Sequence, residues 1–409
     1  MNKNIIYLLL FFSVQAFGQS SEIDDCTNDT IVSIENLPST RGGAHSIVYN
    51  SEIYIFGGAQ NGSAINSTSK YSINSDSWSN LANMPTARSH MGVAELNGIV
   101  YCMAGYGGFF SNKNEAYNIS TNSWQLLPNL PAAMSSCDAV TLNGKIYVIG
   151  GSNGITVNHF YAYSPATNTY QTLSTPIQNR SEGSLLVYNN KIYLVGGQYY
   201  NGSQYCSNKL DEYDPLLDAW STKTDLPAAL RGSAVTLYNN KIYVFGGSST
   251  TPVVTPQNSL YAYDFTSNTW STLNNTPFTI YDMDAISNNN IAYLFGGYNS
   301  TNVTSNLCYK YYCLDLLASV NELYFENYFS VFPNPTKDIV TIELTIESSI
   351  LKGHLIIITN SLGQNILTKS VNSNQIKIDS STLGDSGIYF INLIDSQNNI
   401  VKTKKIVRL

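Results

Sequence analysis

A nine-residue segment occurs twice in this chain, fifty residues apart. Residues 189–197 read NNKIYLVGG, and residues 239–247 read NNKIYVFGG. Related segments end at residues 58, 105, 151 and 297, so that six copies follow one another every 46 to 50 residues. A period of this length is typical of repeat proteins, in which each copy is one structural unit and the core forms between neighbouring copies. The repeat therefore determines the fold class before any local motif is considered.

Each copy contains four stretches with the composition of short β-strands. Before the paired glycines, two such stretches flank an Asn-Asn or Asn-Gly pair, as in SAVTLYNNKIYVFGG, which predicts a tight hairpin. After the glycines, a Tyr and a second large aromatic residue seven positions later flank a turn rich in Asn, Ser and Asp, which predicts a second hairpin. Four antiparallel strands per copy are typical of a β-propeller blade. The aromatic pairs of the first five copies are Tyr71 and Trp78, Tyr117 and Trp124, Tyr163 and Tyr170, Tyr213 and Trp220, and Tyr263 and Trp270.

Paired glycines followed by a spaced Tyr and Trp resemble the signature of the kelch family. The resemblance covers about residues 29–313, with departures at Ala104 in the second copy and Tyr170 in the third. It implies an all-β chain that forms a six-bladed propeller. No Trp follows the sixth pair of glycines at the expected distance, whereas the strand-like segment TIVSIENLPSTR precedes the first pair. We therefore expect the N-terminal strand to complete the last blade and close the ring.

This closure bears on the cysteines. It places Cys26 just before the N-terminal strand and Cys313 just after the third strand of the sixth blade, so a disulfide between them would clasp the ring. Two unpaired thiols are the alternative. No CxxC spacing suggests a metal or redox site, and we interpret the cysteines as structural.

The first residues have the pattern of a secretory signal peptide. Lys3 precedes an apolar run from Ile5 to Phe12, which is too short to span a bilayer, and small residues follow near a predicted cleavage before Gln19. We expect a signal peptide over residues 1–18, the propeller over 19–313 and a linker over 314–328.

The period stops near residue 329, where β-rich runs alternate with turn signals and predict a small Ig-like β-sandwich over residues 329–409. The order FPNPTKD, LGQ, LGDSGIYFI and KTKKIVRL resembles the type A C-terminal sorting domain of the type IX secretion system of Bacteroidetes. That resemblance implies passage through the periplasm, a secreted or cell-surface location, and the type IX secretion machinery as a partner.

Charged residues make up only 12% of the chain, and the formal net charge is −7. Clustered Lys and Arg, which bind the phosphates of nucleic acids, are missing, so we expect no nucleic acid partner. No zinc-protease, phosphate-loop or calcium-loop motif occurs, and we predict no metal, no cofactor and no assigned catalytic residue. We expect a monomer.

Arginine has an uneven distribution. Of five in the chain, four stand 16 or 17 residues before the second glycine of their copy, where the innermost strand of a blade would begin: Arg41, Arg88, Arg180 and Arg231. We expect them around one mouth of the central channel, either bracing adjacent blades or binding an acidic ligand through bidentate contacts. The same segments contain His45, His90, Glu182, Tyr281, Asp282 and Asp284.

Two functions are compatible with this pattern. The first is an exported binding protein without enzymatic activity, whose channel mouth and blade loops recognise a glycan or a protein. The second is an enzyme similar to the six-bladed kelch sialic-acid mutarotases, acting on an acidic sugar in the channel. The number of repeats and the pairing of Arg180 with Glu182 in the sequence favour the enzyme, whereas the lack of a recognisable catalytic set favours the binding protein.

Overall fold

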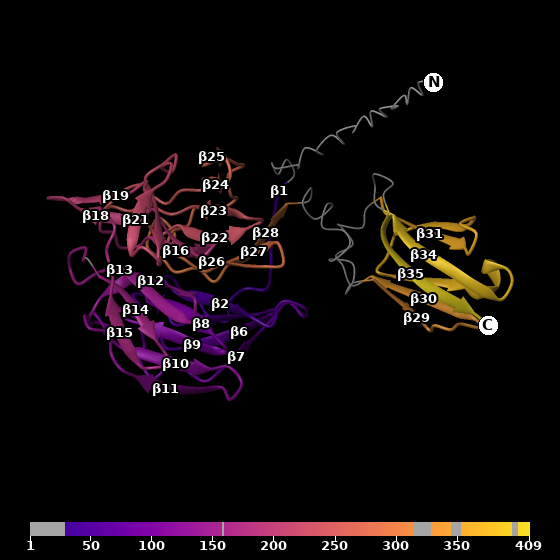
Figure 1. Cartoon of the computed structure of the whole chain (residues 1–409), viewed down its shortest axis with the longest axis horizontal. Coiled ribbons are helices and arrows are strands. Elements are labelled where there is room, and N and C mark those ends of the chain that lie inside the picture. The colour runs from indigo at the N-terminus through magenta and orange to yellow at the C-terminus, as the bar shows by residue number, and fades with distance from the viewer. Residues whose placement is uncertain (1–28, 158, 314–328, 345–352, 395–399) are drawn as a thin grey trace, which may run out of the picture. The chain divides into compact units, whose positions relative to one another are not determined.

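A computed structural model describes residues 29–157, 159–313, 329–344, 353–394 and 400–409 (Figure 1). The described residues fall into two compact units, Asp29–Tyr312 and a C-terminal unit that begins at Cys313. Both consist of antiparallel β-sheets. The all-β prediction is confirmed.

The first unit is a propeller of six four-stranded sheets, and in blades 1 to 5 the innermost strand comes first in the chain. Blade 1 contains β2 (His45–Tyr49), β3 (Glu52–Phe56), β6 (Thr68–Ser72) and β7 (Ser77–Asn80). Blade 2 contains β8 (Gly92–Leu96), β9 (Ile99–Met103), β10 (Asn114–Asn118) and β11 (Ser123–Leu127). Blade 3 contains β12 (Ser135–Leu142), β13 (Lys145–Ser152), β14 (Phe160–Ser164) and β15 (Thr169–Thr172).

Blades 4 to 6 repeat the arrangement. Blade 4 contains β16 (Ser184–Tyr188), β17 (Lys191–Val195), β20 (Leu210–Asp214) and β21 (Ala219–Thr222), and blade 5 contains β22 (Ala234–Tyr238), β23 (Lys241–Phe245), β24 (Leu260–Asp264) and β25 (Thr269–Thr272). Blade 6 contains β26 (Asp284–Asn288), β27 (Ile291–Phe295) and β28 (Cys308–Cys313). Short hairpins extend two blades: β4 (Ala59–Gln60) with β5 (Ser63–Ala64), and β18 (Gln198–Tyr200) with β19 (Gln204–Cys206).

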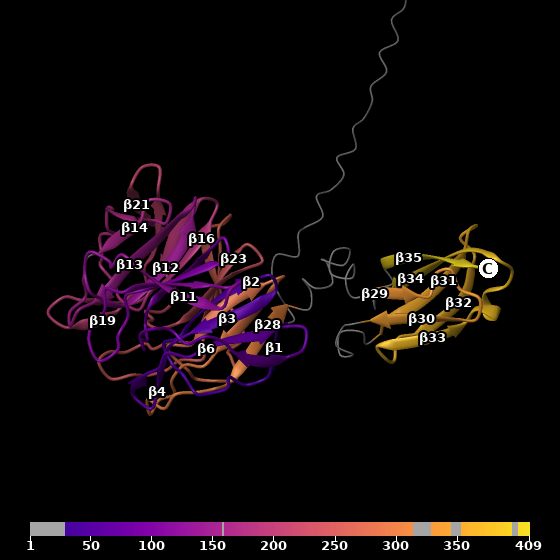
Figure 2. The ribbon, with the colours of Figure 1, turned by 90° about the horizontal axis from the view of Figure 1, so that it is seen from below.

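The ring closes as the sequence predicts. The fourth strand of blade 6 is β1 (Asp29–Ser33), from the other end of the unit, and it pairs with β28 (Figure 2). The first and last strands of the propeller therefore share one sheet.

The repeated aromatic residues hold neighbouring blades together. Tyr117 pairs with Trp124 across strands β10 and β11, and both rings contact Phe56 of blade 1. The Trp124 Nε1 donates a hydrogen bond to the carbonyl oxygen of Ala82 in the segment between the blades, at 2.8 Å. The Tyr170 hydroxyl reaches the corresponding carbonyl of Pro128, at 3.0 Å, which explains why a Tyr can replace the Trp in blade 3.

The paired glycines allow two blades to approach closely. Gly57 has φ +56°, and a Cβ atom there would lie 2.3 Å from the carbonyl oxygen of Arg88 in the next blade. Gly58 donates its N–H to that same oxygen, at 3.0 Å. A side chain at Gly57 would separate the strands, so the sequence repeats the glycine for a steric reason.

The C-terminal unit is a sandwich of two sheets. One sheet has the order β29 (Phe329–Phe332), β30 (Ile339–Leu344), β33 (Gln375–Asp379); the other has the order β32 (Asn365–Ser370), β31 (Leu355–Asn360), β34 (Gly387–Ile394), β35 (Ile400–Arg408). A 3₁₀ turn, η1 (Ser380–Leu383), follows β33. Alternate residues of the inner faces, such as Ile342, Ile358 and Ile391, are fully buried between the sheets.

Some predictions concern residues outside this description. The signal peptide, the linker and Cys26 lie among the residues that the structure does not describe, as does the side chain of Cys313, so the disulfide stays a prediction. The thiols of Cys102, Cys137, Cys206 and Cys308 are free. Within the described ranges, no helix is long and apolar enough to cross a membrane.

Candidate functional site

The six blades meet at one end of the channel in a closed ring of backbone hydrogen bonds. Each blade contributes one residue with φ between +47° and +59° to this ring. The residue lies at the entry to the innermost strand of its blade. Its N–H donates to the carbonyl oxygen of the same position in the preceding blade, at 2.7–3.0 Å, until blade 1 bonds to blade 6. We call these residues the mouth ring: Gly43, His90, Ser136, Glu182, Gly232 and Asp282.

Side chains of the mouth ring form a charged network. The His90 Nε2 lies 3.3 Å from the Asp282 Oδ2. The Arg231 Nη1 donates to the Glu182 Oε2, and the Gln198 Nε2 donates to the other Glu182 oxygen, at 3.0 Å. The imidazole of His90 lies over Gly43, where a Cβ atom would be 2.5 Å from the ring. The glycine therefore makes room for the histidine.

Burial and neighbouring charges act together on these groups. Burial of His90 disfavours its charged form, but the hydrogen bond to Asp282 and the nearby carboxylates outweigh this and raise the pKa of the imidazole. Burial raises the pKa of Glu182, with a further contribution from Asp282, while Arg231 opposes the shift. Both shifts favour the protonated form of the group.

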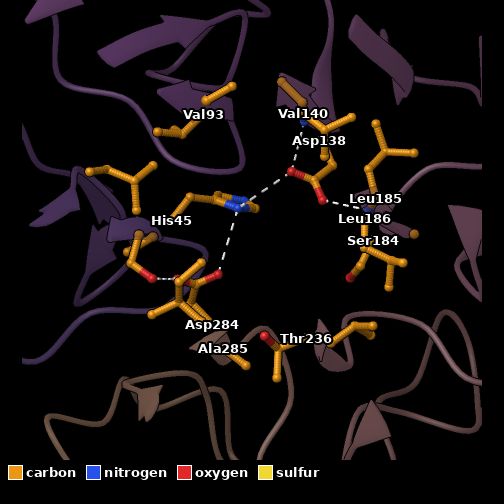
Figure 3. Close-up of a pocket in the computed structure, with 18 of the residues that line it drawn as sticks. His45, Val93, Asp138, Val140, Ser184, Leu185, Leu186, Thr236, Asp284 and Ala285 are labelled. Carbon is orange, nitrogen blue, oxygen red and sulfur yellow. Dashed lines mark hydrogen bonds and ion pairs between the residues drawn. The ribbon is translucent and has the colours of Figure 1, made fainter. Parts of the chain in front are cut away.

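A second tier of polar groups lies deeper in the channel, at the starts of inner strands from three different blades (Figure 3). The Nδ1 of His45 lies 3.9 Å from an oxygen of Asp138 and 3.9 Å from an oxygen of Asp284. Backbone N–H groups of Ala139 and Leu185 donate to Asp138, at 2.8 and 2.7 Å. The Ser46 hydroxyl donates to Asp284. The carboxylates are therefore fixed by strand backbones and hydroxyls and face the imidazole across the channel.

Burial determines the protonation of this tier. It raises the pKa of Asp138 to about 6 and that of Asp284 to about 6. Burial also lowers the pKa of His45, although Asp138 opposes this effect. At neutral pH the imidazole is therefore neutral and most of each carboxyl is ionised.

These groups line one cavity. It has a volume of about 360 Å³ and is lined by residues of all six inner strands, together with His90, Ser136, Glu182 and Asp282 of the mouth ring. Apolar side chains such as Val93, Val140 and Leu186 complete the walls. A small polar molecule would contact carboxylates, an imidazole and hydroxyls at once.

The arginines are mostly elsewhere, contrary to the expectation of an arc around the mouth. The side chains of Arg41, Arg88 and Arg180 are 1%, 0% and 1% exposed and lie within their own blades. Arg88 donates to the carbonyl oxygens of Cys102 and Ala104, because its long side chain runs outward along the blade. These side-chain contacts connect the strands of one blade rather than bracing adjacent blades.

Arg231 differs because it stands one position later in its repeat, where the backbone directs it toward Glu182. Its guanidinium also lies 5.7 Å from the centre of the Tyr281 ring. Tyr281 stacks on Tyr298 and donates to Asn302, at 2.6 Å, rather than lining the cavity. Among the residues singled out in the sequence, the structure thus brings together six: His45, His90, Glu182, Arg231, Asp282 and Asp284.

Sequence reasoning did not identify Asp138, although a signal for it existed. In the repeat, Asp138 occupies the same position as His45 and Asp284, two residues after the mouth ring. A comparison of the six copies column by column at this position would have revealed three ionisable residues that must meet in the channel.

Comparisons with known proteins agree with this architecture. The model of the KLHDC2/KLHL20/DRC7 Kelch-repeats domain matches residues 21–197 and 184–323, and the model of the Secretion system C-terminal sorting domain matches residues 330–408. Among curated proteins, the chain is 32% identical over 106 residues to Kelch repeat and BTB domain-containing protein A55 of Vaccinia virus (strain Western Reserve), covering 25% of this chain and 19% of the viral protein. It is 31% identical over 106 residues to Kelch repeat and BTB domain-containing protein 1 of Ectromelia virus (strain Moscow), with the same coverage.

The match therefore spans about a fifth of the length of these viral relatives. Among solved structures, the chain in "Structure of YjhT" superimposes with a TM-score of 0.60 and 16% identity, covering 67% of this chain and 95% of that one. This likeness shows a shared fold.

Proposed function

Because the chain belongs to the kelch-repeat family and ends in a secretion-system sorting domain, we propose that it is an exported propeller that binds a neutral sugar at its channel mouth. The sorting domain marks a secreted or cell-surface protein that is handled by the type IX secretion machinery. The observation that carries the proposed ligand is the 360 Å³ cavity with His45, Asp138 and Asp284 on its walls. Small-molecule sites in proteins are typically roughly 300–1,000 Å³ with a few convergent polar groups.

The charge balance of the cavity favours a neutral ligand over an acidic one. Five residues with carboxyl groups line it or its mouth: Glu95, Asp138, Glu182, Asp282 and Asp284. Arg231 is the arginine that reaches the mouth ring in the described part of the chain. Its guanidinium is already paired with the Glu182 carboxylate. A ligand carboxylate would meet repulsion, whereas the hydroxyls of a sugar would donate hydrogen bonds to the carboxylate oxygens.

An outer depression adjoins the cavity and offers surfaces suited to a sugar ring. It measures about 660 Å³, shares His90, Ser136 and Glu182 with the channel, and is lined further by Tyr106 and Tyr298. Tyr106 is 42% exposed. Tyrosine combines an apolar ring face, on which the C–H face of a sugar can stack, with a hydroxyl group that hydrogen-bonds.

A glycan array tests the proposal. We expect the exported protein to bind neutral glycans more strongly than sialylated ones, and Asp138→Asn to weaken binding about tenfold by replacing one carboxylate oxygen with an amide N–H₂. Asp225→Asn is the matched control, because Asp225 is paired with Lys209 and does not line the cavity. Binding that prefers sialylated glycans, or that ignores Asp138→Asn, would contradict the proposal.

A second candidate function is proton transfer on an acidic sugar, as in a sialic-acid mutarotase. It is supported by the two carboxyl groups with pKa about 6 beside the neutral imidazole of His45, since such groups can give and accept protons near neutral pH. NMR spectroscopy of anomer interconversion would measure it, with N-acetylneuraminic acid and glucose as substrates. If the protein accelerates anomer interconversion and Asp138→Asn abolishes that acceleration, the enzyme would be favoured over the binding protein.

A further inference from the structure

Three blades begin with a buried arginine at the same repeat position, and two of these arginines face a carboxylate. Arg88 pairs with Glu115 at 2.8 Å, and Arg180 pairs with Asp211 at 2.6 Å. Both carboxylates project from the third strand of their blade, opposite a residue of the second strand: Glu115 opposite Cys102, and Asp211 opposite Leu194.

Blade 1 has a serine where the others have the carboxylate. Ser69 stands opposite Ile55 in the same register, and it is fully buried. The Nη2 of Arg41 lies 3.2 Å from the Ser39 hydroxyl and 3.4 Å from the Ser69 hydroxyl. Its Nε and Nη1 have no hydrogen-bond partner among the described residues. Arg41 is thus a buried cation without a carboxylate.

The guanidinium nevertheless stays charged. Burial lowers the pKa of Arg41 to about 10, which is still well above neutral pH. An unpaired charge removed from water destabilises the folded protein. A negative charge close to the guanidinium would offset that penalty.

Among the described residues, the side chains around Arg41 do not supply this charge. The thiol of Cys308 is close enough to interact electrostatically with Arg41, but burial raises its pKa to about 12, so it is neutral. The hydroxyl of Ser67, directly before β6, is buried and has no partner among the described residues. The surroundings of Arg41 therefore offer donors and need an acceptor.

We propose that Arg41 and Ser69 form a binding site for a small monovalent anion, chloride, which takes the place of the carboxylate of the sister blades. The ion would contact the Nε and Nη1 of Arg41, which have no partner among the described residues, beside the serine that stands in place of the carboxylate. Arginine N–H groups and a serine hydroxyl are suitable donors to a halide.

The site lies where the ring closes. The backbone N–H of Arg41 donates to Ser305 at 2.9 Å, and its carbonyl oxygen accepts from Gly297 at 2.9 Å; both partners belong to blade 6. An anion bound at Arg41 would therefore stabilise the contact between the first and last blades, and the closed ring would be more stable in chloride.

Thermal unfolding of the full-length protein tests the site. At equal ionic strength, we expect a Tm about 2–4 °C higher in sodium chloride than in sodium gluconate, rising with chloride to saturation. Ser69→Asp supplies the missing carboxylate, as Asp211 does, so it should raise the Tm in gluconate and abolish the chloride effect. Ser75→Asp, on the exposed turn of the same blade, adds the same charge and should retain the chloride effect.

Two results would overturn the proposal: equal Tm values of the wild type in both salts, or a chloride effect that persists in Ser69→Asp. A direct measurement does not depend on the variant. Crystals of the wild type soaked in sodium bromide should show an anomalous scattering peak beside the Arg41 guanidinium, and its absence would refute the site.

Discussion

At the scale of single residues, one amino acid in nearly the same repeat position has three environments. Arg88 and Arg180 neutralise buried carboxylates, Arg41 has hydroxyl neighbours, and Arg231, shifted by one residue, reaches the channel mouth. The spacing of these residues could be read from the sequence, but their environments could not. They depend on the partner from the third strand, Glu115, Asp211 or Ser69, which only the register identifies.

The bracing role predicts a large loss of stability at Arg88. Arg88→Met leaves Glu115 buried without its partner, which should lower the free energy of unfolding by about 3–5 kcal/mol, measured by urea denaturation. Adding Glu115→Leu should recover much of this loss, because the pair is then replaced by apolar groups. A loss below about 1 kcal/mol in the single variant would show that the ion pair does not brace the blade.

The channel carboxylates predict a pH dependence of stability. Burial raises the folded-state pKa of Asp284 from 3.8 to about 6, so between pH 4 and 6 the folded protein binds more protons than the unfolded chain. Ionisation in this window therefore destabilises the fold as the pH rises. Asp284→Asn should be more stable than the wild type at pH 7, by about 1–3 kcal/mol, and this difference should shrink toward pH 4. The Tm of both proteins, measured at pH 4 and pH 7, tests this. A Tm difference between Asp284→Asn and the wild type that is the same at both pH values would contradict the prediction.

At the scale of the elements, hairpins and blade order could be predicted because strand periodicity and turn residues recur along the repeats and the aromatic pair recurs in the first five copies. Ring closure could be predicted because the sixth copy lacks that pair and a strand-like segment precedes the first copy. The mouth ring could not be predicted. Its six residues include two glycines and four non-glycine residues with positive φ, and their side chains share no chemistry. What they share is a hydrogen bond between backbones of consecutive blades, which leaves no residue signature.

The glycines of the mouth ring give an element-scale prediction. In Gly43→Ala the new methyl group would displace the His90 imidazole, 2.5 Å away, so sugar binding should weaken in addition to a cost of about 1–2 kcal/mol for a side chain at positive φ. Gly144→Ala is the control, because its φ is +73° and no atom lies within 4 Å of the added Cβ. It should show the stability cost with unchanged glycan binding. Equal binding by both variants would show that His90 is not part of the site.

At the scale of the whole molecule, the sorting domain and the propeller have separate cores, which predicts that they have separable roles. Deleting residues 329–409 should leave a folded propeller in the periplasm. The wild-type protein, which we expect in the culture medium or on the cell surface, is the control. Immunoblots of cell fractions measure this. Undiminished export of the truncated chain would contradict the role of the sorting domain.

The backbone conformation of the mouth ring also restricts which side chains can occur there. A left-handed backbone conformation is tolerated by Gly, Asn, Asp, His and other polar residues but is strained for β-branched and bulky apolar ones. Because the ring imposes this conformation on all six blades, substitutions at these positions are drawn mainly from hydrophilic side chains or glycine. The opening of this channel can therefore change its specificity over evolutionary time while remaining polar, because the backbone conformation disfavours large apolar side chains at these positions.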